Sequence, residues 1–215
     1  MQKEDSNTER ENMKSNTALL IIDMQNDFVL SGAPQYVNGA EEIIPKIKKV
    51  LGHFRSNSLP VFHVVREYRA DGSDIEAFRL RGFLSHRGYC VPGTKGCEIV
   101  NELCPIEGEY RIVKNRFSGF MDTELDLILR RLGICKIAVC GIQYPNCIRA
   151  TIFDGVSLGY EVTLVTDATG AKTEAVAKAN IRDIHNIGVT CITAGRLLRS
   201  GKLKRNRGMA PVRLR

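Results

Sequence analysis

The sequence predicts a three-layer α/β/α domain of the Rossmann-like type, with a central, mainly parallel sheet of six strands. Two observations support this fold class. Short apolar runs recur along the chain, and between them lie longer segments whose apolar residues follow helical spacing. Strands that alternate with helices favour parallel pairing, because each helix carries the chain back across one face of the sheet. We expect one such domain at residues 17–198 of the 215-residue chain.

The first part of the chain is expected to form two buried strands around one long helix. Residues 17–22 are a continuous apolar run, which is typical of a central strand buried on both faces. Asp27 follows in a predicted loop, where we expect it to be solvated or to cap a turn. Residues 39–57 carry apolar residues at helical spacing, with lysines on the opposite side. A second apolar run at 59–65 predicts the next strand, and His63 within it is expected to pack in the core.

The middle of the chain combines a long charged segment with shorter regular elements. Residues 66–96 are charged and contain several glycines, and a loop of this length is uncommon unless it is functional. We therefore expect this segment to lie over a site and to include a short helix at 75–80. Residues 110–113 predict the third strand. Residues 123–132 predict a helix with Thr123 as its N-cap.

The last part of the chain continues the alternation of strands and helices. Apolar runs bounded by glycine predict strands at 137–140, 161–166 and 189–192. Helical spacing predicts one helix after Cys147 and another at 173–186.

The two terminal segments are expected to lie outside the domain. Residues 1–16 are polar, carry both signs of charge and lack the apolar stretch of a secretory signal, so we expect a disordered segment and a cytoplasmic protein. The net charge of +7 owes much to six basic residues and no acids in 201–215. We interpret 199–215 as a solvated, disordered basic tail. Contact with nucleic acid or a membrane surface through this tail is the alternative.

The seven cysteines do not form the pattern of a disulfide framework. Their number is odd, their spacing is irregular, and no two form the C-x-x-C pair typical of a thiolate zinc site. Cys135, Cys140 and Cys191 lie in or beside apolar strands and are expected to be small core residues.

Cys147 is the candidate nucleophile of this sequence. The apolar run at 137–140 is broken by Gly141 and Pro145, and Asn146 is a favourable helix N-cap. Cys147 then falls at the first turn of the following helix. The positive end of the helix dipole lowers the pKa of a thiol placed there, so we expect a reactive thiolate. The alternative is a buried, inert cysteine.

Asp23 and Lys114 are the candidate partners of Cys147. Each follows or ends a predicted strand, and parallel strands with right-handed crossovers bring all their carboxyl ends to one edge of the sheet. Asp23 can accept the thiol proton and return it to a leaving amine, and Lys114 supplies a stabilising positive charge. Cys147 can then attack a carbonyl carbon to form an acyl-enzyme. A surface ion pair between the lysine and the aspartate is the alternative.

Three motifs resemble the isochorismatase-like cysteine hydrolases, which include nicotinamidases, N-carbamoylsarcosine amidohydrolases and ureidoacrylate hydrolases. The motifs lie at 18–28, 113–120 and 141–147, within a resemblance that covers about 17–194. By this resemblance Asp23, Lys114 and Cys147 match the catalytic triad of the family. The segments around Arg66 and Cys147 are similar to those of plant proteins labelled probable inactive nicotinamidases.

The resemblance also implies a backbone feature beside the nucleophile and an assembly state. A cis peptide bond is expected between Ile142 and Gln143, with the backbone N–H groups of Gln143 and Cys147 forming an oxyanion hole. Members of the family commonly form dimers or tetramers, so we expect a homo-oligomer.

Four further residues are candidates for binding the substrate. Arg66, Glu67, Arg116 and Tyr144 lie near the predicted strand ends, and we expect them to line the pocket and to bind a carboxylate or ureido group.

One departure from the family pattern concerns a metal. Nicotinamidases carry a metal-binding Asp-x-His motif after the second strand, whereas residues 65–71 read Val-Arg-Glu-Tyr-Arg-Ala-Asp and His86 is isolated. We therefore predict no metal and no cofactor. The resemblance implies a metal-independent hydrolase that cleaves a C–N bond of a small amide or carbamoyl (ureido) compound through a Cys147 acyl-enzyme. The alternative is an inactive nicotinamidase homologue that binds a small molecule or acts as a scaffold.

Overall fold

A six-stranded sheet with the strand order β3-β2-β1-β4-β5-β6 forms the centre of the molecule. The computed structural model describes residues 16–85 and 88–200. All five neighbouring strand pairs are parallel, which confirms the predicted sheet and makes it wholly parallel. The strands are β1 (Thr17–Ile22), β2 (Val61–Arg66), β3 (Tyr110–Lys114), β4 (Lys136–Ile142), β5 (Glu161–Gly170) and β6 (Thr190–Ile192).

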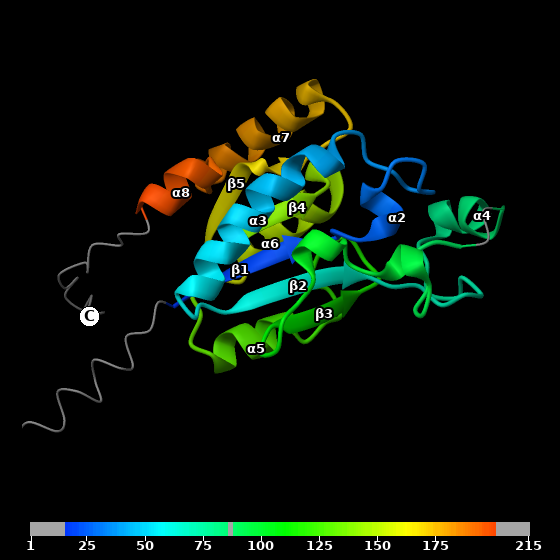
Figure 1. Cartoon of the computed structure of the whole chain (residues 1–215), viewed down its shortest axis with the longest axis horizontal. Helices are drawn as coiled ribbons and strands as arrows, with labels where there is room; N and C mark the ends of the chain where they lie inside the picture. The colour runs from blue at the N-terminus through cyan, green and yellow to red at the C-terminus, as the bar shows by residue number, and fades with distance from the viewer. Residues whose placement is uncertain (1–15, 86–87, 201–215) are drawn as a thin grey trace, which may run out of the picture.

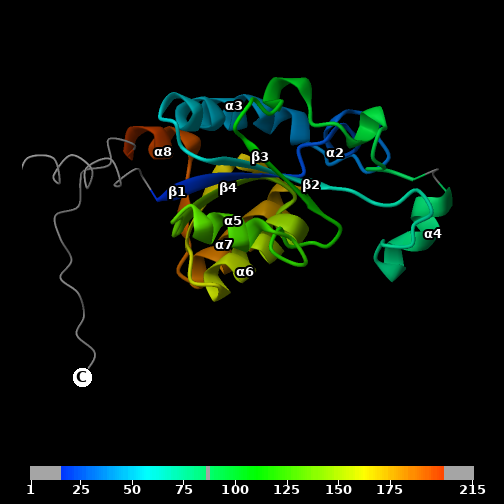
Figure 2. The same cartoon turned by 90° about the horizontal axis from the view of Figure 1, so that it is seen from below.

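Helices cover both faces of this sheet, as the three layers in Figure 2 show. One face carries α3 (Ala40–Ser56) and α8 (Ala194–Ser200), and the other carries α5 (Leu125–Arg131), α6 (Arg149–Ser157) and α7 (Glu174–Asn186). The predicted α/β/α architecture is therefore confirmed.

Shorter elements gather around the carboxyl ends of the strands. Helices α2 (Asn26–Val29) and α4 (Ala77–Ser85) lie at that end of the molecule, and α4 projects from it (Figure 1). The remaining short elements are two 3₁₀ turns, η1 (Lys95–Cys97) and η2 (Asn101–Leu103), and a π-helical turn, η3 (Tyr144–Ile148).

Strand β1 divides the core into two apolar layers. Its side chains alternate between faces, so Leu19 and Ile21 pack in the layer beneath α3, while Leu20 and Ile22 pack in the layer beneath α6. Because β1 pairs with both β2 and β4, neither of its edges is open. The continuous apolar run in the sequence thus corresponds to a central strand that is buried on both faces.

Gly141 lies inside strand β4, although it was predicted to end that strand. Strand β4 runs on to Ile142, two residues past the predicted end. Gly141 has φ 111°, and a Cβ atom at this position would lie 2.2 Å from the backbone oxygen of Ile22. The glycine is therefore needed for the close approach of β4 to β1 rather than for a break in the strand.

Two helix boundaries also differ from the prediction. Helix α5 begins at Leu125 with Glu124 at its N-cap position, one residue after the predicted Thr123. The Thr123 hydroxyl still accepts from the Leu125 N–H at 3.3 Å, and it donates to the backbone oxygen of Gly119 at 2.6 Å. Helix α8 was not predicted and extends to Ser200, beyond the expected domain end at 198. Its first backbone N–H, from Ala194, donates to a carboxylate oxygen of Asp167 at 2.6 Å.

The cysteines divide between the core and the surface. All seven are free thiols. Cys140 is buried as predicted and Cys191 is half-buried. Cys135 is exposed, contrary to the prediction, because it precedes the first paired residue of β4.

The two predicted terminal segments, 1–16 and 199–215, are only partly described. Residues 1–15 and 201–215 lie outside the described residues, as do the expectations made for them. Asn16, which was predicted to belong to the disordered N-terminal segment, is described and ordered: its backbone oxygen accepts hydrogen bonds from the N–H groups of Cys135 and Lys136, both at 3.0 Å. Within 16–85 and 88–200, the structure has no helix long and apolar enough to span a bilayer.

Candidate active site

Asp23, Lys114 and Cys147 come together at the carboxyl edge of the sheet. Asp23 directly follows β1, Lys114 ends β3, and Cys147 lies in η3 just after β4. The Lys114 ammonium donates to Asp23 Oδ2 at 2.9 Å. The two side chains are 0% and 4% exposed, so this is a buried pair and not the surface ion pair of the alternative interpretation.

The Asp23 carboxylate is only half satisfied. Its backbone has φ 52°, and its N–H donates to the Val64 oxygen at 2.8 Å, which fixes the residue between β1 and β2. Oδ2 accepts from Lys114, but Oδ1 is buried and has no hydrogen-bond partner among the described residues. A buried acceptor without a partner is unfavourable unless it serves a proton or a ligand.

Cys147 is a buried thiol with charged neighbours. Burial raises its pKa, and the negative charge of Asp23 raises it further, while Lys114 and Arg66 lower it. The expectation of a pKa lowered by the helix dipole is therefore wrong for the free protein, because the dipole argument left out the desolvation of a side chain that is only 5% exposed.

Arg66 brings a second cation to the sulfur. It ends β2, is 1% exposed, and its Nη2 lies 3.3 Å from Cys147 Sγ. The ends of three neighbouring strands of the sheet thus place Asp23, Arg66 and Lys114 around the Cys147 sulfur.

A cavity of about 250 Å³ opens beside this cluster. Asp23, Cys147 and Gln143 form part of its wall. Three cations, Arg66, Arg79 and Lys172, also line it, and Asp23 is the one carboxylate among its lining residues. Because Lys114 already pairs with Asp23, the charge of the cavity is positive overall.

The other predicted binding residues do not line this cavity. Glu67 lines a different cavity, of about 350 Å³, and pairs there with Arg111. Arg116 donates to the backbone oxygens of Asp74 and Asn115, at 2.6 and 2.8 Å. Tyr144 is buried, and its hydroxyl donates to the Thr166 oxygen at 3.0 Å.

The separation of Arg66 from Glu67 follows from the alternation of side chains along a strand. Phe62 and Val64 of β2 belong to the core layer that contains Cys147, and Arg66 continues their face. The next residue, Glu67, points to the other face. Arg66 and Glu67 were both predicted to line the substrate pocket because they are adjacent in the sequence.

The nucleophile turn (residues 143–148, which include Cys147) has the backbone conformation that the family resemblance implied. The peptide bond between Ile142 and Gln143 is cis. Asn146 is not a helix N-cap, since it lies inside η3, where its N–H donates to the Gln143 oxygen at 3.2 Å. Thr151, which was not a predicted site residue, fixes the turn: its hydroxyl donates to the Cys147 oxygen at 2.7 Å and accepts from the Gly119 N–H at 2.9 Å.

Gln25 is a second residue that was not singled out, although it lies in the first motif. Its side chain accepts from the Arg66 N–H at 2.7 Å and donates to the Arg66 oxygen at 2.8 Å. It also donates to the Cys97 oxygen at 2.8 Å. A buried amide thereby fixes the end of β2, and with it the position of the Arg66 side chain.

Asp27 is buried, contrary to the prediction of a solvated or capping residue. It is 8% exposed, and its Oδ2 accepts from the Cys90 N–H at 2.6 Å. A Cβ atom at Gly96 would meet this carboxylate at 2.2 Å. Asp27 therefore holds the long segment after β2 against α2, a contact between residues 63 positions apart that local patterns do not reveal.

The residues after β2 do not fit a metal site. Arg66 places a buried cation at the end of the strand, where nicotinamidases carry their metal-binding motif. In the described part of the chain, no three His, Cys, Asp or Glu side chains are grouped as metal ligands. His86 lies outside the described residues.

Comparisons with known proteins place this geometry in a family. A model of the isochorismatase domain matches residues 17–196. The chain is 46% identical to a probable inactive nicotinamidase of Arabidopsis thaliana over 81% of this chain and 90% of that protein. It is 32% identical to a ureidoacrylate amidohydrolase of Caulobacter segnis, over 79% of each. Its fold matches the crystal structure of an isochorismatase family protein from Desulfovibrio vulgaris, with a TM-score of 0.84, 49% identity, and coverage of 88% of this chain and 99% of that one.

Proposed function

Because this chain belongs to the isochorismatase family of hydrolases, we propose that it cleaves a C–N bond of a small amide or carbamoyl (ureido) compound through an acyl-enzyme on Cys147. The observation that carries the proposal is the unpartnered Oδ1 of Asp23, a buried acceptor in the wall of the cavity that Cys147 also lines. A nucleophile, a base and a space for substrate thus share one site.

The first half of the proposed reaction moves one proton and makes one bond. The Cys147 thiol gives its proton to Asp23 Oδ1, and the sulfur forms a bond with the substrate carbonyl carbon while the C=O pair moves to oxygen. When the carbonyl re-forms, the C–N bond breaks and the leaving nitrogen takes the proton from Asp23. The products of this half are an amine or ammonia and a thioester on Cys147.

The second half restores the enzyme. Asp23 takes a proton from water, the hydroxide oxygen bonds to the thioester carbon, and the C–S bond breaks. The proton held by Asp23 returns to sulfur, and the acid product leaves. Lys114 stays charged throughout and keeps Asp23 Oδ2 occupied at 2.9 Å, so that proton transfer uses Oδ1.

The backbone of the nucleophile turn is the proposed oxyanion hole. Gln143 is the residue before η3 and Cys147 lies within η3, and both line the cavity. Their N–H groups are proposed to donate to the oxygen that gains charge during attack, and one such donor typically contributes about 10²–10³ in rate.

The cavity favours a substrate with an acidic group. Arg79 and Lys172 line it, and although Arg79 pairs with Glu76 at 3.4 Å, the remaining positive charge would attract a carboxylate on the substrate. The name of one relative, ureidoacrylate amidohydrolase, describes a carbamoyl compound with such a group. We therefore place N-carbamoyl and amide derivatives of small carboxylic acids first among candidate substrates.

A substrate screen tests this proposal. Wild-type protein is incubated with amides and carbamoyl acids, and released amine or ammonia is measured. The proposal expects turnover of at least one carbamoyl or amide acid, its loss in Cys147→Ala, and its retention in Cys104→Ala, which alters an exposed cysteine that does not line this cavity. Full activity in Cys147→Ala would exclude the mechanism.

Metal independence is a separate part of the proposal. Exhaustive chelation should leave both turnover and the unfolding temperature unchanged, since Arg66 occupies the end of β2. Loss of turnover on chelation, restored by added zinc, would contradict this part alone.

An inactive homologue is the second candidate, and two observations favour it. Burial raises the pKa of Cys147, and one similar protein is named a probable inactive nicotinamidase. This candidate expects ligands that raise the unfolding temperature equally in wild type and Cys147→Ala, with no turnover of any of them. The homo-oligomer and the cytoplasmic location remain predictions.

A further inference from the structure

The hydrogen bonds that Arg66 makes within the protein leave few of its N–H groups available to a substrate. Nη1 donates to the Tyr68 hydroxyl and to Glu76 Oε1, the latter at 3.0 Å. Nη2 donates to the Arg116 oxygen at 2.9 Å and contacts Cys147 Sγ at 3.3 Å. The two terminal nitrogens of a guanidinium carry four N–H groups, and these four partners account for them. The part of Arg66 that faces the reaction therefore points at sulfur.

We propose that the Arg66 guanidinium is a catalytic group that carries the charge of the Cys147 thiolate. This inference rests on the proposed function and assigns the group that makes its first step possible. When the thiol proton moves to Asp23, the negative charge leaves a carboxylate paired with Lys114 and appears on sulfur. Arg66 is then the cation in direct contact with that charge.

The charges around the sulfur make the role of Arg66 distinct from that of Lys114. Cys147 is faced by Asp23 from the end of β1, by Arg66 from β2 and by Lys114 from β3, and Arg79 and Lys172 line the same cavity. The Lys114 ammonium donates to Asp23 Oδ2 and, at 3.4 Å, to the Arg116 oxygen. Lys114 thus holds the base, and Arg66 contacts the nucleophile.

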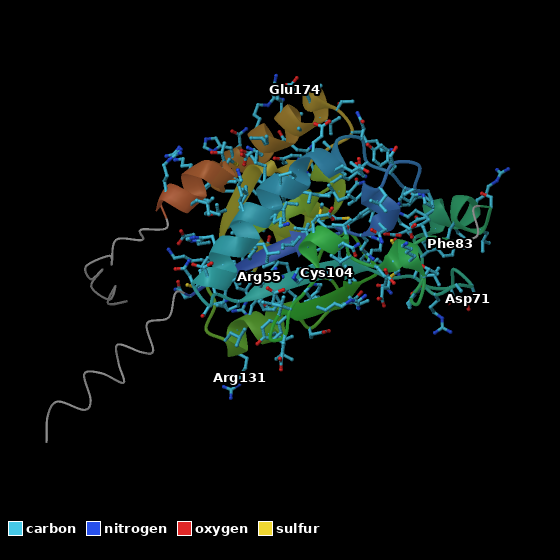
Figure 3. The ribbon with its side chains drawn as sticks, in the orientation of Figure 1. Arg55, Asp71, Phe83, Cys104, Arg131 and Glu174 are labelled. Carbon is cyan, nitrogen blue, oxygen red and sulfur yellow. The ribbon has the colours of Figure 1, made fainter. Side chains whose placement is uncertain are left out.

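The segment before α4 positions this guanidinium. Glu76 contacts Arg66 through Oε1 and accepts from the Tyr68 hydroxyl through Oε2 at 2.6 Å. Tyr68 packs edge-on against Phe83 of α4, with ring centroids 5.8 Å apart. Figure 3 shows Phe83 and Asp71 at the projecting end of the molecule that this segment forms. Glu76 and Tyr68 are therefore positioning residues that act through Arg66.

The rate of Cys147 alkylation by iodoacetamide, followed by peptide mass spectrometry as a function of pH, tests the inference without a substrate. In Arg66→Gln the midpoint of the rate profile should rise by about one to three pH units, since an opposite charge at this distance shifts a pKa by that amount. In Glu76→Gln the amide oxygen can still accept from Arg66, but a negative charge is lost, so the midpoint should fall. Arg66→Lys should lie between wild type and Arg66→Gln.

The matched control is Arg111→Gln, which removes an arginine that pairs with Glu67 and lines the other cavity. Its midpoint should equal that of wild type. A merely structural role predicts the same direction of change in Arg66→Gln and Glu76→Gln, and that result would overturn the inference. An unchanged midpoint in Arg66→Gln or, if that variant does not fold, in both Arg66→Lys and Glu76→Gln would overturn it as well.

Turnover gives the catalytic part of the test. With any substrate from the screen, Arg66→Gln should lose activity near neutral pH and regain part of it as the pH rises, because the thiolate can then form without its cation. Loss that no pH restores would contradict the catalytic role. If the alkylation midpoints shift as expected but wild type turns over no substrate, the proposed function fails while the contact of Arg66 with the thiolate stands.

Discussion

Two ionic clusters, one partly buried and one buried, share strand β2, and they differ in how completely their carboxylates are hydrogen-bonded. The Glu109 cluster consists of Arg55, His63 and Glu109. Glu109 accepts from Arg55 at 2.7 and 2.9 Å, from His63 at 2.9 Å and from the Ile106 N–H at 3.0 Å. Arg55 also donates to the Cys104 oxygen at 2.8 Å, and the two residues lie side by side in Figure 3.

The Asp23 cluster consists of Asp23, Arg66, Lys114 and Cys147. Here one carboxylate oxygen has a partner and the other has none within the described residues, although both are removed from solvent. A carboxylate whose two oxygens are both hydrogen-bonded stabilises the fold. A carboxylate that has one oxygen without a partner, beside the proposed nucleophile, is available to accept a proton. We therefore propose a structural role for the Glu109 cluster and a chemical role for the Asp23 cluster.

Lys114→Met should break the Asp23 cluster most severely. It leaves a carboxylate buried without a counter-charge, which costs about 3–5 kcal/mol of unfolding free energy. Chemical denaturation measures this change, and turnover should be lost as well. Lys136→Met is the control, because its ion pair with Glu161 is exposed and should contribute less than about 1 kcal/mol. Equal losses in the two variants would contradict a special role for the buried pair.

Asp23→Asn should separate chemistry from packing within the same cluster. The amide keeps the shape of the side chain but cannot take the thiol proton, so kcat/KM should fall by about 10²–10⁴. Steady-state assays with a substrate from the screen measure this loss. Asp126→Asn, which alters a carboxylate paired with Arg130 on the surface, should leave kcat/KM unchanged. An Asp23→Asn enzyme with normal kcat/KM would refute Asp23 as the base.

Glu109→Gln should lower the stability of the fold and leave turnover unchanged. It weakens charge-assisted hydrogen bonds to Arg55 and His63, with an expected loss of about 2 kcal/mol in unfolding free energy. Turnover at a temperature where the variant is folded should equal that of wild type. Loss of turnover without loss of stability would reverse the assignment of the two clusters.

The acid side of the stability curve should report the Glu109 cluster. Burial alone would raise the pKa of Glu109, but hydrogen bonds from Arg55 and His63 outweigh it and hold the pKa at about 2. A folded pKa below the unfolded one stabilises the protein above the unfolded value, and this stability is lost as pH falls toward 2. Glu109 should contribute at most about 1.4 kcal/mol per pH unit to the slope of unfolding free energy against pH, measured by denaturation, so the slope should be smaller in Glu109→Gln. Identical slopes would contradict it.

Much of the fold followed from local patterns, because buried parallel strands are apolar along their whole length. The run at 17–22 identified β1, and the position of Asp23 after it indicated the active edge of the sheet. Gly141 was misread because its role depends on the distance to Ile22, a residue on another strand. Asp27 was misread for the same kind of reason, since Cys90 is its partner only in the folded chain.

The sequence predicted which residues lie at the candidate site better than it predicted where their side chains point. Strand ends placed Asp23, Lys114 and Cys147 at one edge, but the face to which each neighbouring side chain points decides which residues join them. Arg66 and Glu67 are adjacent in sequence and line different cavities. The pKa of Cys147 was misjudged because burial and the neighbouring Asp23 carboxylate raise it, and the sequence specifies neither.

Trapping of the acyl-enzyme tests the central claim most directly. Wild-type protein is mixed with a substrate from the screen, quenched in acid within one turnover, and digested for peptide mass spectrometry. The account predicts the mass of the acyl or carbamoyl group on the peptide that contains Cys147, and its absence when Cys147 is replaced by alanine. Turnover that proceeds at the full rate with no adduct on Cys147, in wild type and in Cys147→Ala alike, would contradict it.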